Sequence, residues 1–313
     1  MSARRPLSAW IARYGLVLAL ALVALTLAAI KPRFLSPANL VNVARQMSIN
    51  GVLAVGVTVV LLTGGVDLSL GSVVALAGVA AACWAHPETY PVAVPILVGV
   101  AAGALCGAAN GLIVTRGRVA PFIVTLGMMT VARGLALVVS GGRPVSNLSP
   151  QFTWMGSAEV LGLPLLVWML LGVAAVVHVA LQRLRWGRYV YAVGGNEAAA
   201  RASGIDVGRI KLSAYLVCGA CAGLAGVMLA ARITTGQPNA GVAYELDAIA
   251  AVVIGGTSLS GGVGGVIGTL LGALLMGVIN NGLDLLNVTP YYQQIVKGLI
   301  IVGAVWLDRR HKA

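Results

Sequence analysis

The residues of this chain that could do chemistry are a few polar side chains inside long apolar runs. Ionisable and amide side chains at membrane depth are costly, so they mark a solute pathway or a packed interior pair. Asp67 and Asp247 both adjoin glycine-rich breaks, at 64–71 and 255–265, and broken helices can line a solute cavity. We therefore predict a translocation pathway formed by these residues: Asp67, Ser69, Asn110, Asp247, Thr257, Ser258, Asn280 and Asn281.

Helix capping is the alternative role for these carboxylates, and it is the role favoured for Asp67. Arg133, Glu245 and Lys297 are further charged residues within the apolar runs. Because few carboxylates are embedded, the sequence gives little support to a proton- or sodium-coupled relay. It favours a neutral polar solute.

No catalytic or metal-binding arrangement accompanies these residues. The sequence contains neither a G-x-x-x-x-G-K-[ST] phosphate loop nor a G-x-S-x-G turn, and its three histidines are scattered. Cys218 and Cys221 have the spacing of a redox or zinc pair, but they lie in an apolar run without a second cluster. The sequence therefore predicts a non-catalytic protein with no bound metal, and buried cysteines.

The composition predicts an integral membrane protein. Of 313 residues, 59% are hydrophobic and 10% are charged, whereas soluble domains carry about 25% charged residues. The 41 glycines favour closely packed helices, and alternating strands with aromatic girdles are missing, which excludes a barrel. The net charge of +12 does not indicate nucleic-acid binding, because most basic residues lie in short connections and at the termini.

About ten apolar segments follow one another, and some are too short or too broken for a full crossing. The basic residues, including Arg4, Arg5 and Lys312, gather on one side of the predicted topology, so both termini are expected in the cytoplasm. The fourth segment carries Gly103, Gly107 and Gly111 on one close-packing face. The segments cover residues 14–30, 39–63, 72–84, 92–115, 119–140, 163–182, 210–231, 245–254, 266–283 and 288–307, and 141–162 is expected to be an external loop.

An internal echo suggests an inverted repeat. Residues 64–71 and 255–262 share the pattern G-G-x-x-L-S-x-G, and Asn110-Gly111 before Pro121 matches Asn281-Gly282 before Pro290. The fifth segment starts inside and the tenth starts outside, as an inverted repeat requires. The glycine-rich echo does not fit this inversion without gaps, and chance matches between glycine-rich segments are the alternative.

The longest polar interval, 194–209, has the composition of a short helix. Asn196 can cap its start, Glu197 lies in the first turn, and Gly204 can end it. Flanking basic residues predict a position on the cytoplasmic membrane face. This helix is either an ordinary connection or a docking element for a soluble partner.

Three blocks of the chain resemble the permease subunits of bacterial ATP-driven monosaccharide importers, the ribose class most closely. They are GGNEAAARASGI at 194–205, GVAYELDAIAAVVIGGTSLSGGVGG at 241–265 and GGVDLSLGSVVALAG at 64–78. Two departures from the general importer motif are visible. Gly204 follows Ala199 after four residues instead of three, and Ser213 stands where that motif has proline.

The resemblance implies one permease domain over 1–313, with a cytoplasmic loop at 183–209 that carries an ATPase-coupling helix. It implies a homodimer in the bacterial inner membrane, a cytoplasmic ATP-binding subunit that binds ATP and Mg, and a periplasmic sugar-binding protein. The sugar would be ribose or a similar monosaccharide. A self-contained facilitator or secondary carrier is the alternative function. The implied coupling residues are Asn196, Glu197, Ala198, Ala199, Ser203, Gly204 and Ile205.

Overall fold

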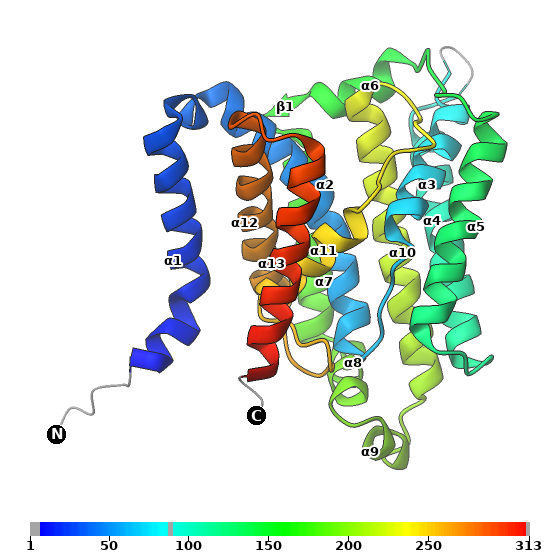
Figure 1. Ribbon diagram of the computed structural model, residues 1–313. Helices are drawn as coiled ribbons and strands as arrows, with labels where there is room; N and C mark the ends of the chain where they lie inside the picture. Colours follow the sequence, from blue (N-terminus) through cyan, green and yellow to red (C-terminus); the bar gives the residue numbers. More distant parts are fainter. Residues whose placement is uncertain (1–6, 87–89, 311–313) are drawn as a thin grey trace.

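The structure is a computed structural model that describes residues 7–86 and 90–310 as a helical bundle with one short β-hairpin (Figure 1). Residues 4, 5 and 312, whose charges support the predicted orientation, lie outside the described residues. The elements are α1 (Leu7–Ile30), η1 (Pro32–Leu35), α2 (Pro37–Leu62), α3 (Leu70–Trp84), α4 (Ala93–Thr115), α5 (Pro121–Ser140), α6 (Pro150–Ser157), β1 (Glu159–Val160), β2 (Leu163–Pro164), α7 (Leu165–Arg183), α8 (Arg185–Gly195), α9 (Glu197–Ala202), α10 (Val207–Ile233), α11 (Tyr244–Ile254), α12 (Val266–Leu285) and α13 (Pro290–Arg310).

Ten of these helices occupy the ten apolar segments predicted from the sequence: α1, α2, α3, α4, α5, α7, α10, α11, α12 and α13. Within the described residues, six are long and apolar enough to cross a membrane: α2, α4, α5, α7, α10 and α12. Helix α3 is apolar but shorter, and α11 has only 11 residues. The predicted multi-pass helical membrane protein agrees with this architecture, while the count of ten crossings stays a prediction.

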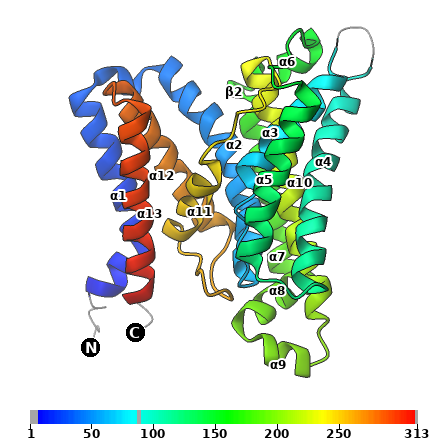
Figure 2. The ribbon, with the colours of Figure 1, turned by 45° about the vertical axis from the view of Figure 1, so that its right-hand side comes forward.

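Helices α2 and α10 form the centre of the bundle. Helix α10 packs against α2, α3 and α4, whereas α1, α12 and α13 lie together on the other side of α2 (Figure 2). The predicted close-packing face of α4 is confirmed, because a Cβ at Gly103 or Gly107 would collide with the backbone of α10. Cys218 and Cys221 are buried in α10, as predicted. Below, the two ends of the bundle are called the α9 end and the α6 end (Figure 1).

Two half-length helices, α3 and α11, start inside the bundle. Each follows a non-helical segment, 64–69 before α3 and 234–243 before α11, and the first turn of α3 meets the second segment where the backbones of Gly71 and Gly241 touch. Gly241 has φ +73°, and a side chain at either glycine would separate the two chains. From this junction α3 runs toward the α6 end and α11 toward the α9 end (Figure 2).

The glycine-rich echo does not mark a repeat. Gly262 N donates to Leu62 O at 3.0 Å, so the segment 255–265 lies beside the end of α2, where 64–71 begins, at the α9 end. Equivalent parts of an inverted repeat would lie at opposite ends. The first segment joins a full-length helix to a half helix, whereas the second joins the half helix α11 to the full-length α12.

Two short helices were missed by the sequence analysis. Residues 141–162, expected as a loop, contain α6 and the strand β1, and Ser149 caps α6 by accepting a hydrogen bond from Phe152 N at 3.3 Å. Helix α8 lies in the stretch 183–195 that was expected to be a connection. Both helices are short and contain polar as well as apolar residues, so no long apolar run predicts them.

Candidate functional site

The predicted helix at 196–204 is present as α9, and its local signals are confirmed. The Asn196 side chain accepts a hydrogen bond from Ala199 N at 2.9 Å. At the other end Gly204 adopts φ +82°, and Ile205 N donates to Ala200 O at 3.1 Å. This left-handed ending favours glycine, which has no Cβ to strain it.

Glu197 joins α9 to the N-terminal part of α10. Its carboxylate accepts hydrogen bonds from Lys211 Nζ at 2.6 Å and from Arg201 Nη2 at 3.0 Å. The Lys211 hydrogen bond holds the pKa of Glu197 below its usual range, and the charges of Lys211 and Arg201 act in the same direction. The ionised carboxylate therefore fixes α9 on α10.

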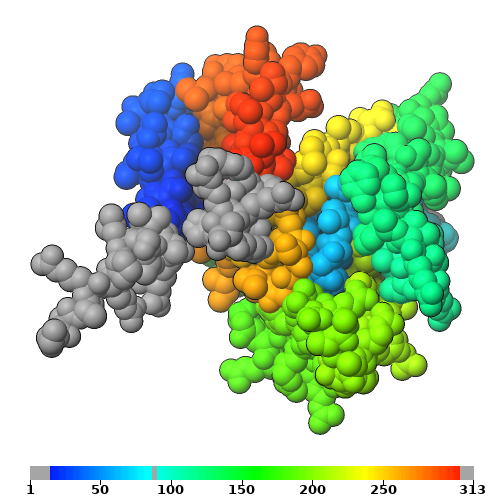
Figure 3. Space-filling model, turned by 60° about the horizontal axis from the view of Figure 1, so that its bottom comes forward, coloured from blue at the N-terminus to red at the C-terminus, as the bar shows by residue number. Residues whose placement is uncertain are grey.

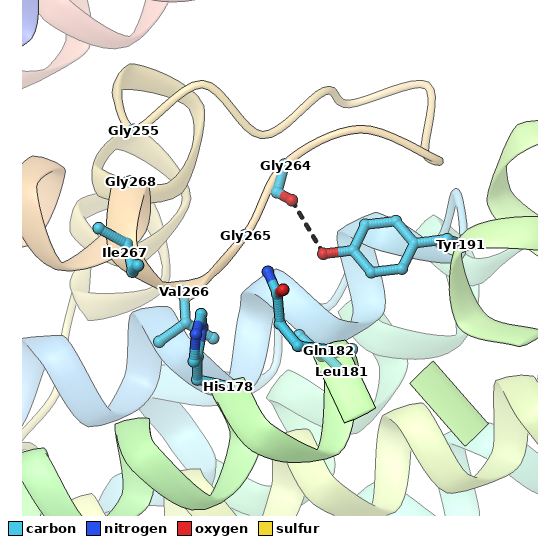
Figure 4. A pocket seen from close by; sticks show the side chains of 10 residues that line it. All are labelled: His178, Leu181, Gln182, Tyr191, Gly255, Gly264, Gly265, Val266, Ile267 and Gly268. Atoms are coloured by element: carbon cyan, nitrogen blue, oxygen red, sulfur yellow. Dashed lines mark hydrogen bonds between the residues drawn. The ribbon is translucent and has the colours of Figure 1, made fainter. Parts of the chain in front are cut away.

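Helix α8 connects α9 to two other parts of the bundle. Trp186 Nε1 donates to Ser213 Oγ in α10 at 2.7 Å, and Tyr191 Oη donates to Gly264 O at 2.9 Å. Gly264 belongs to the segment that joins α11 to α12, so Tyr191 contacts the chain that leaves the half helix. Figure 4 shows the Tyr191 ring reaching across to this segment.

A cavity of about 260 Å³ lies beside this contact at the α9 end. His178 and Gln182 of α7 face the backbone of Gly265 and Val266 across it (Figure 4). The glycines of this wall leave backbone groups uncovered. The cavity therefore lies between α7, the Tyr191 side chain of α8 and the segment that joins α11 to α12.

The outer surface of α9 is open. Asn196 to Ala199 and Arg201 to Gly204 are exposed, Ile205 is half-buried, and only Ala200 is packed inward at 4% exposure. Figure 3, which looks at the α9 end, shows this region as a yellow-green lobe in front of the helices. Six of the seven predicted coupling residues are therefore exposed on the part of the chain that protrudes at the α9 end.

The sequence of α8 carries a signal of helical structure. Gly187, Val190 and Val193 recur at three-residue spacing and are buried, whereas Arg185 and Arg188 are exposed. This periodicity is typical of an amphipathic helix. The predicted loop at 183–209 therefore contains two helices, α8 and α9, and it begins where α7 ends.

The predicted pathway residues do not form one site. Asp67 Oδ1 accepts hydrogen bonds from Ser69 N at 2.9 Å and Ser69 Oγ at 2.6 Å, and Asn110 Nδ2 donates to Ser69 Oγ at 3.1 Å. All three side chains are almost completely buried. Asp67 therefore orders the chain just before α3 through Ser69, the residue at the N-cap position, but no side chain caps the helix, so the predicted capping by Asp67 is not observed.

A second cluster surrounds Asp247 in the first turn of α11. Asp247 Oδ2 accepts hydrogen bonds from Lys297 Nζ at 2.7 Å and from Asn280 Nδ2 at 3.4 Å. Asn281 instead exchanges two amide hydrogen bonds with Asn39, at 2.8 and 2.9 Å. It faces a polar cavity at the α6 end that Asp284 and Arg33 also line.

Thr257 and Ser258 lie in a third place, the turn after α11. Both are buried, and Ser258 N donates to Val263 O at 2.9 Å, which closes this turn. The eight residues therefore occupy the start of α3, the start of α11, the α6 end and the turn at 255–265. Their contact with a solute remains a prediction.

Sequence comparison relates the whole chain to transport proteins. Residues 39–305 match the family described as branched-chain amino acid transport system, permease component. The chain is 45% identical to the ribose import permease of Escherichia coli (strain K12), over 96% of this chain and 95% of that protein. It is 45% identical to the ribose import permease of Bacillus subtilis (strain 168), over 96% and 94%. The D-allose transport system permease of Escherichia coli (strain K12) is 38% identical, over 95% and 91%. No solved structure matches the chain.

Proposed function

The chain belongs to this permease family, in the ribose import permease class that its sequence blocks predict, and we propose that it is the membrane subunit of an ATP-driven monosaccharide importer. The observation that carries the proposal is the exposed α9 helix, capped at both ends and fixed to a membrane-length helix by Glu197 and Lys211. A simple connection between spans needs none of these contacts.

The α9 end is the cytoplasmic end in this proposal. Helix α1 begins and α13 ends toward it (Figure 1), which supports cytoplasmic termini. The α6 end faces the periplasm and meets the sugar-binding protein. The ATP-binding subunit, which carries ATP and Mg, docks on α8 and α9, and a second copy of the chain completes the membrane part.

Eight of the ten predicted crossings form an inverted repeat, in which α2 to α5 correspond to α10 to α13. The opposite directions of α3 and α11 support this pairing (Figure 2). So does a shared contact, since Asn110 of α4 donates to Ser69 at the start of α3, and Asn280 of α12 donates to Asp247 at the start of α11. Rocking of the two copies against each other alternates access to the solute.

Movement of the ATP-binding subunit reaches the membrane by two connections. Glu197 and Lys211 link α9 to α10, while Tyr191 links α8 to the segment at Gly264. A displacement of α9 therefore acts on the central helix and on the half helix α11 together. The transported sugar is ribose or a monosaccharide of similar size, as the names of the ribose and allose relatives suggest.

Uptake of labelled monosaccharides into proteoliposomes tests this function. We expect uptake to need the ATP-binding subunit, the sugar-binding protein and internal ATP. The double variant Glu197→Arg, Gly204→Val should insert normally but lose uptake and binding of the ATP-binding subunit. Glu159→Arg, Gly162→Val is the matched control, because it changes an exposed ion-paired glutamate and an open left-handed glycine at the α6 end, and it should keep that subunit bound.

A self-contained facilitator or secondary carrier is the second candidate, and the half helices α3 and α11 are compatible with it. Such a protein would transport sugar down a gradient without partners. The Glu197 and Gly204 changes would then leave uptake intact. Transport by the chain alone would therefore contradict the ATP-driven function.

A further inference from the structure

A cavity of about 490 Å³ opens where α5 faces the junction of the two half helices. Arg133 and Thr130 come from α5, Ser72 from the first turn of α3, and Glu245 from the first turn of α11. Met129 and Val242 add apolar surface. None of the eight pathway residues predicted from the sequence lines it.

Arg133 and Glu245 share this cavity without pairing to each other. Arg133 Nη1 donates to Ala240 O at 2.8 Å and to Pro238 O, which holds the non-helical segment 234–243 against α5. Among the described residues, Nε and Nη2 of this guanidinium have no hydrogen-bond partner, and Arg133 forms no ion pair. Two donor groups therefore remain available on the cavity side of the segment.

Glu245 provides the complementary acceptor. A Cβ added to Gly71 would collide with Oε2 of Glu245, so the carboxyl group sits against the first turn of α3. The N-terminus of a helix favours an acidic group. The hydroxyl groups of Ser72 and Thr130 complete a set of donors and acceptors beside apolar side chains.

The volume and lining suit a small polyol. Ligand pockets typically have about 300–1,000 Å³ and combine apolar walls with a few fixed polar groups. A sugar ring has hydroxyl groups on its edge and apolar C–H groups on its faces, so it can use both kinds of wall. Irregular backbone at membrane depth is tolerated where it lines such a cavity, and 234–243 is irregular backbone.

We infer that this cavity is a monosaccharide contact site on the transport route, in which Arg133, Thr130 and Glu245 select the hydroxyl pattern. The inference rests on the proposed function, because it assigns the solute of that transport. The residues that line this cavity are different from the eight pathway residues predicted from the sequence. It gives the membrane subunit a part in sugar selection.

Gly134 permits a steric test of this site. It lies on α5 in the cavity wall, and a Cβ there would meet nothing within 4 Å, so a larger side chain fills the cavity without disturbing the helix. Gly134→Leu should reduce ATP-driven uptake in the complete complex by about tenfold or more, the effect of losing a well-fitted contact. Gly172→Leu on α7 is the matched control, since its Cβ also meets nothing within 4 Å.

Thr130→Val and Glu245→Gln test selection directly. Uptake of the transported sugar is compared with uptake of its single-deoxy derivatives, each at saturating sugar-binding protein. Loss of one hydrogen bond should change the ratio of the two rates by about five- to tenfold for the derivative that lacks the contacted hydroxyl. A purely structural role would lower both rates equally. Thr115→Val is the control, because Thr115 bonds to its own helix at Gly111 O as Thr130 does at Leu126 O.

Unchanged uptake in Gly134→Leu would overturn the inference, and so would unchanged ratios in both selection variants. Loss of the dimer in Gly134→Leu, seen by light scattering, would assign this face to the second copy and also overturn it. These results differ from failure of the proposed function, in which the unsubstituted complex itself takes up no sugar.

Discussion

Asn196 is the residue on which the start of α9 depends. Its side chain accepts the Ala199 N–H, one of the groups that a helix start leaves without a partner. Asn196→Ala should cost about 1 kcal/mol in the local stability of α9. Hydrogen exchange of the α9 amides should then accelerate about fivefold. Ser149→Ala removes the equivalent cap of α6 and should accelerate exchange in α6 only.

Glu197 predicts a pH dependence of the contact between α9 and α10. Its pKa is lowered in the folded protein by the Lys211 hydrogen bond, so the pair adds stability above the ordinary pKa of a carboxyl group. That stability is lost as the pH falls through the lower, folded-state pKa. The side chain is 44% exposed, so the contribution should be below about 1 kcal/mol.

Lys211→Met should move the pKa of Glu197 back toward its usual range, because the partner that lowers it most is gone, and Glu197 would then no longer link α9 to α10 at any pH. NMR titration of the Glu197 carboxyl carbon, identified with Glu197→Gln, measures this shift. Arg209→Met is the control, since Arg209 pairs with Asp206 at 2.9 Å and should leave Glu197 unchanged. Equal titration midpoints in the Lys211→Met variant and the original protein would contradict the assignment.

At the scale of elements, α8 is expected to transmit movement to the segment after α11 through the side chain of Tyr191. Tyr191→Phe keeps the ring but removes the hydroxyl that bonds to Gly264 O. Sugar uptake per ATP hydrolysed should fall severalfold while the ATP-binding subunit stays bound, because the movement of α8 no longer reaches the segment after α11. Tyr189→Phe is a matched control in the same helix. An unchanged ratio of sugar uptake to ATP hydrolysis in Tyr191→Phe would show that the hydrogen bond from Tyr191 to Gly264 transmits no movement.

The elements also show where sequence reasoning succeeds. Apolar runs predict all ten apolar helices, and local caps predict α9, because these signals lie within the element itself. Helix α8 has only a short amphipathic pattern, which is overlooked beside membrane-length runs. The glycine-rich echo between 64–71 and 255–262 does not correspond to the repeat, because both segments lie at one end of the bundle. Only the folded chain shows this arrangement.

The candidate site divides in the same way. Asn196 and Gly204 were predictable because a cap acts on its own helix. The meeting of Arg133 with Glu245 depends on the touching backbones of Gly71 and Gly241. The contact between Gly71 and Gly241 joins segments that are distant in sequence. The residues next to Arg133 and Glu245 along the chain give no sign of it. The sequence therefore predicted which polar residues are embedded, but not which of them share a cavity.

For the whole molecule, the half helix α11 connects two groups of helices. It contacts α2 and α12, and among the described helices it carries the main packing surface of α13. Asp247 and Lys297 form the ion pair at this contact, with side-chain exposures of 3% and 19%. The attachment of α13 therefore depends on a buried charge pair close to the junction of the half helices.

Removing one partner of that pair should destabilise the whole bundle. Lys297→Met leaves the Asp247 carboxylate buried without its cation, which should cost about 3–5 kcal/mol. The double variant Asp247→Asn, Lys297→Met removes both charges, so it should recover most of the loss. Thermal unfolding of the detergent-solubilised protein measures both effects. If the single and double variants unfold at the same temperature, the ion pair does not hold α13 on α11, and apolar packing alone must attach it.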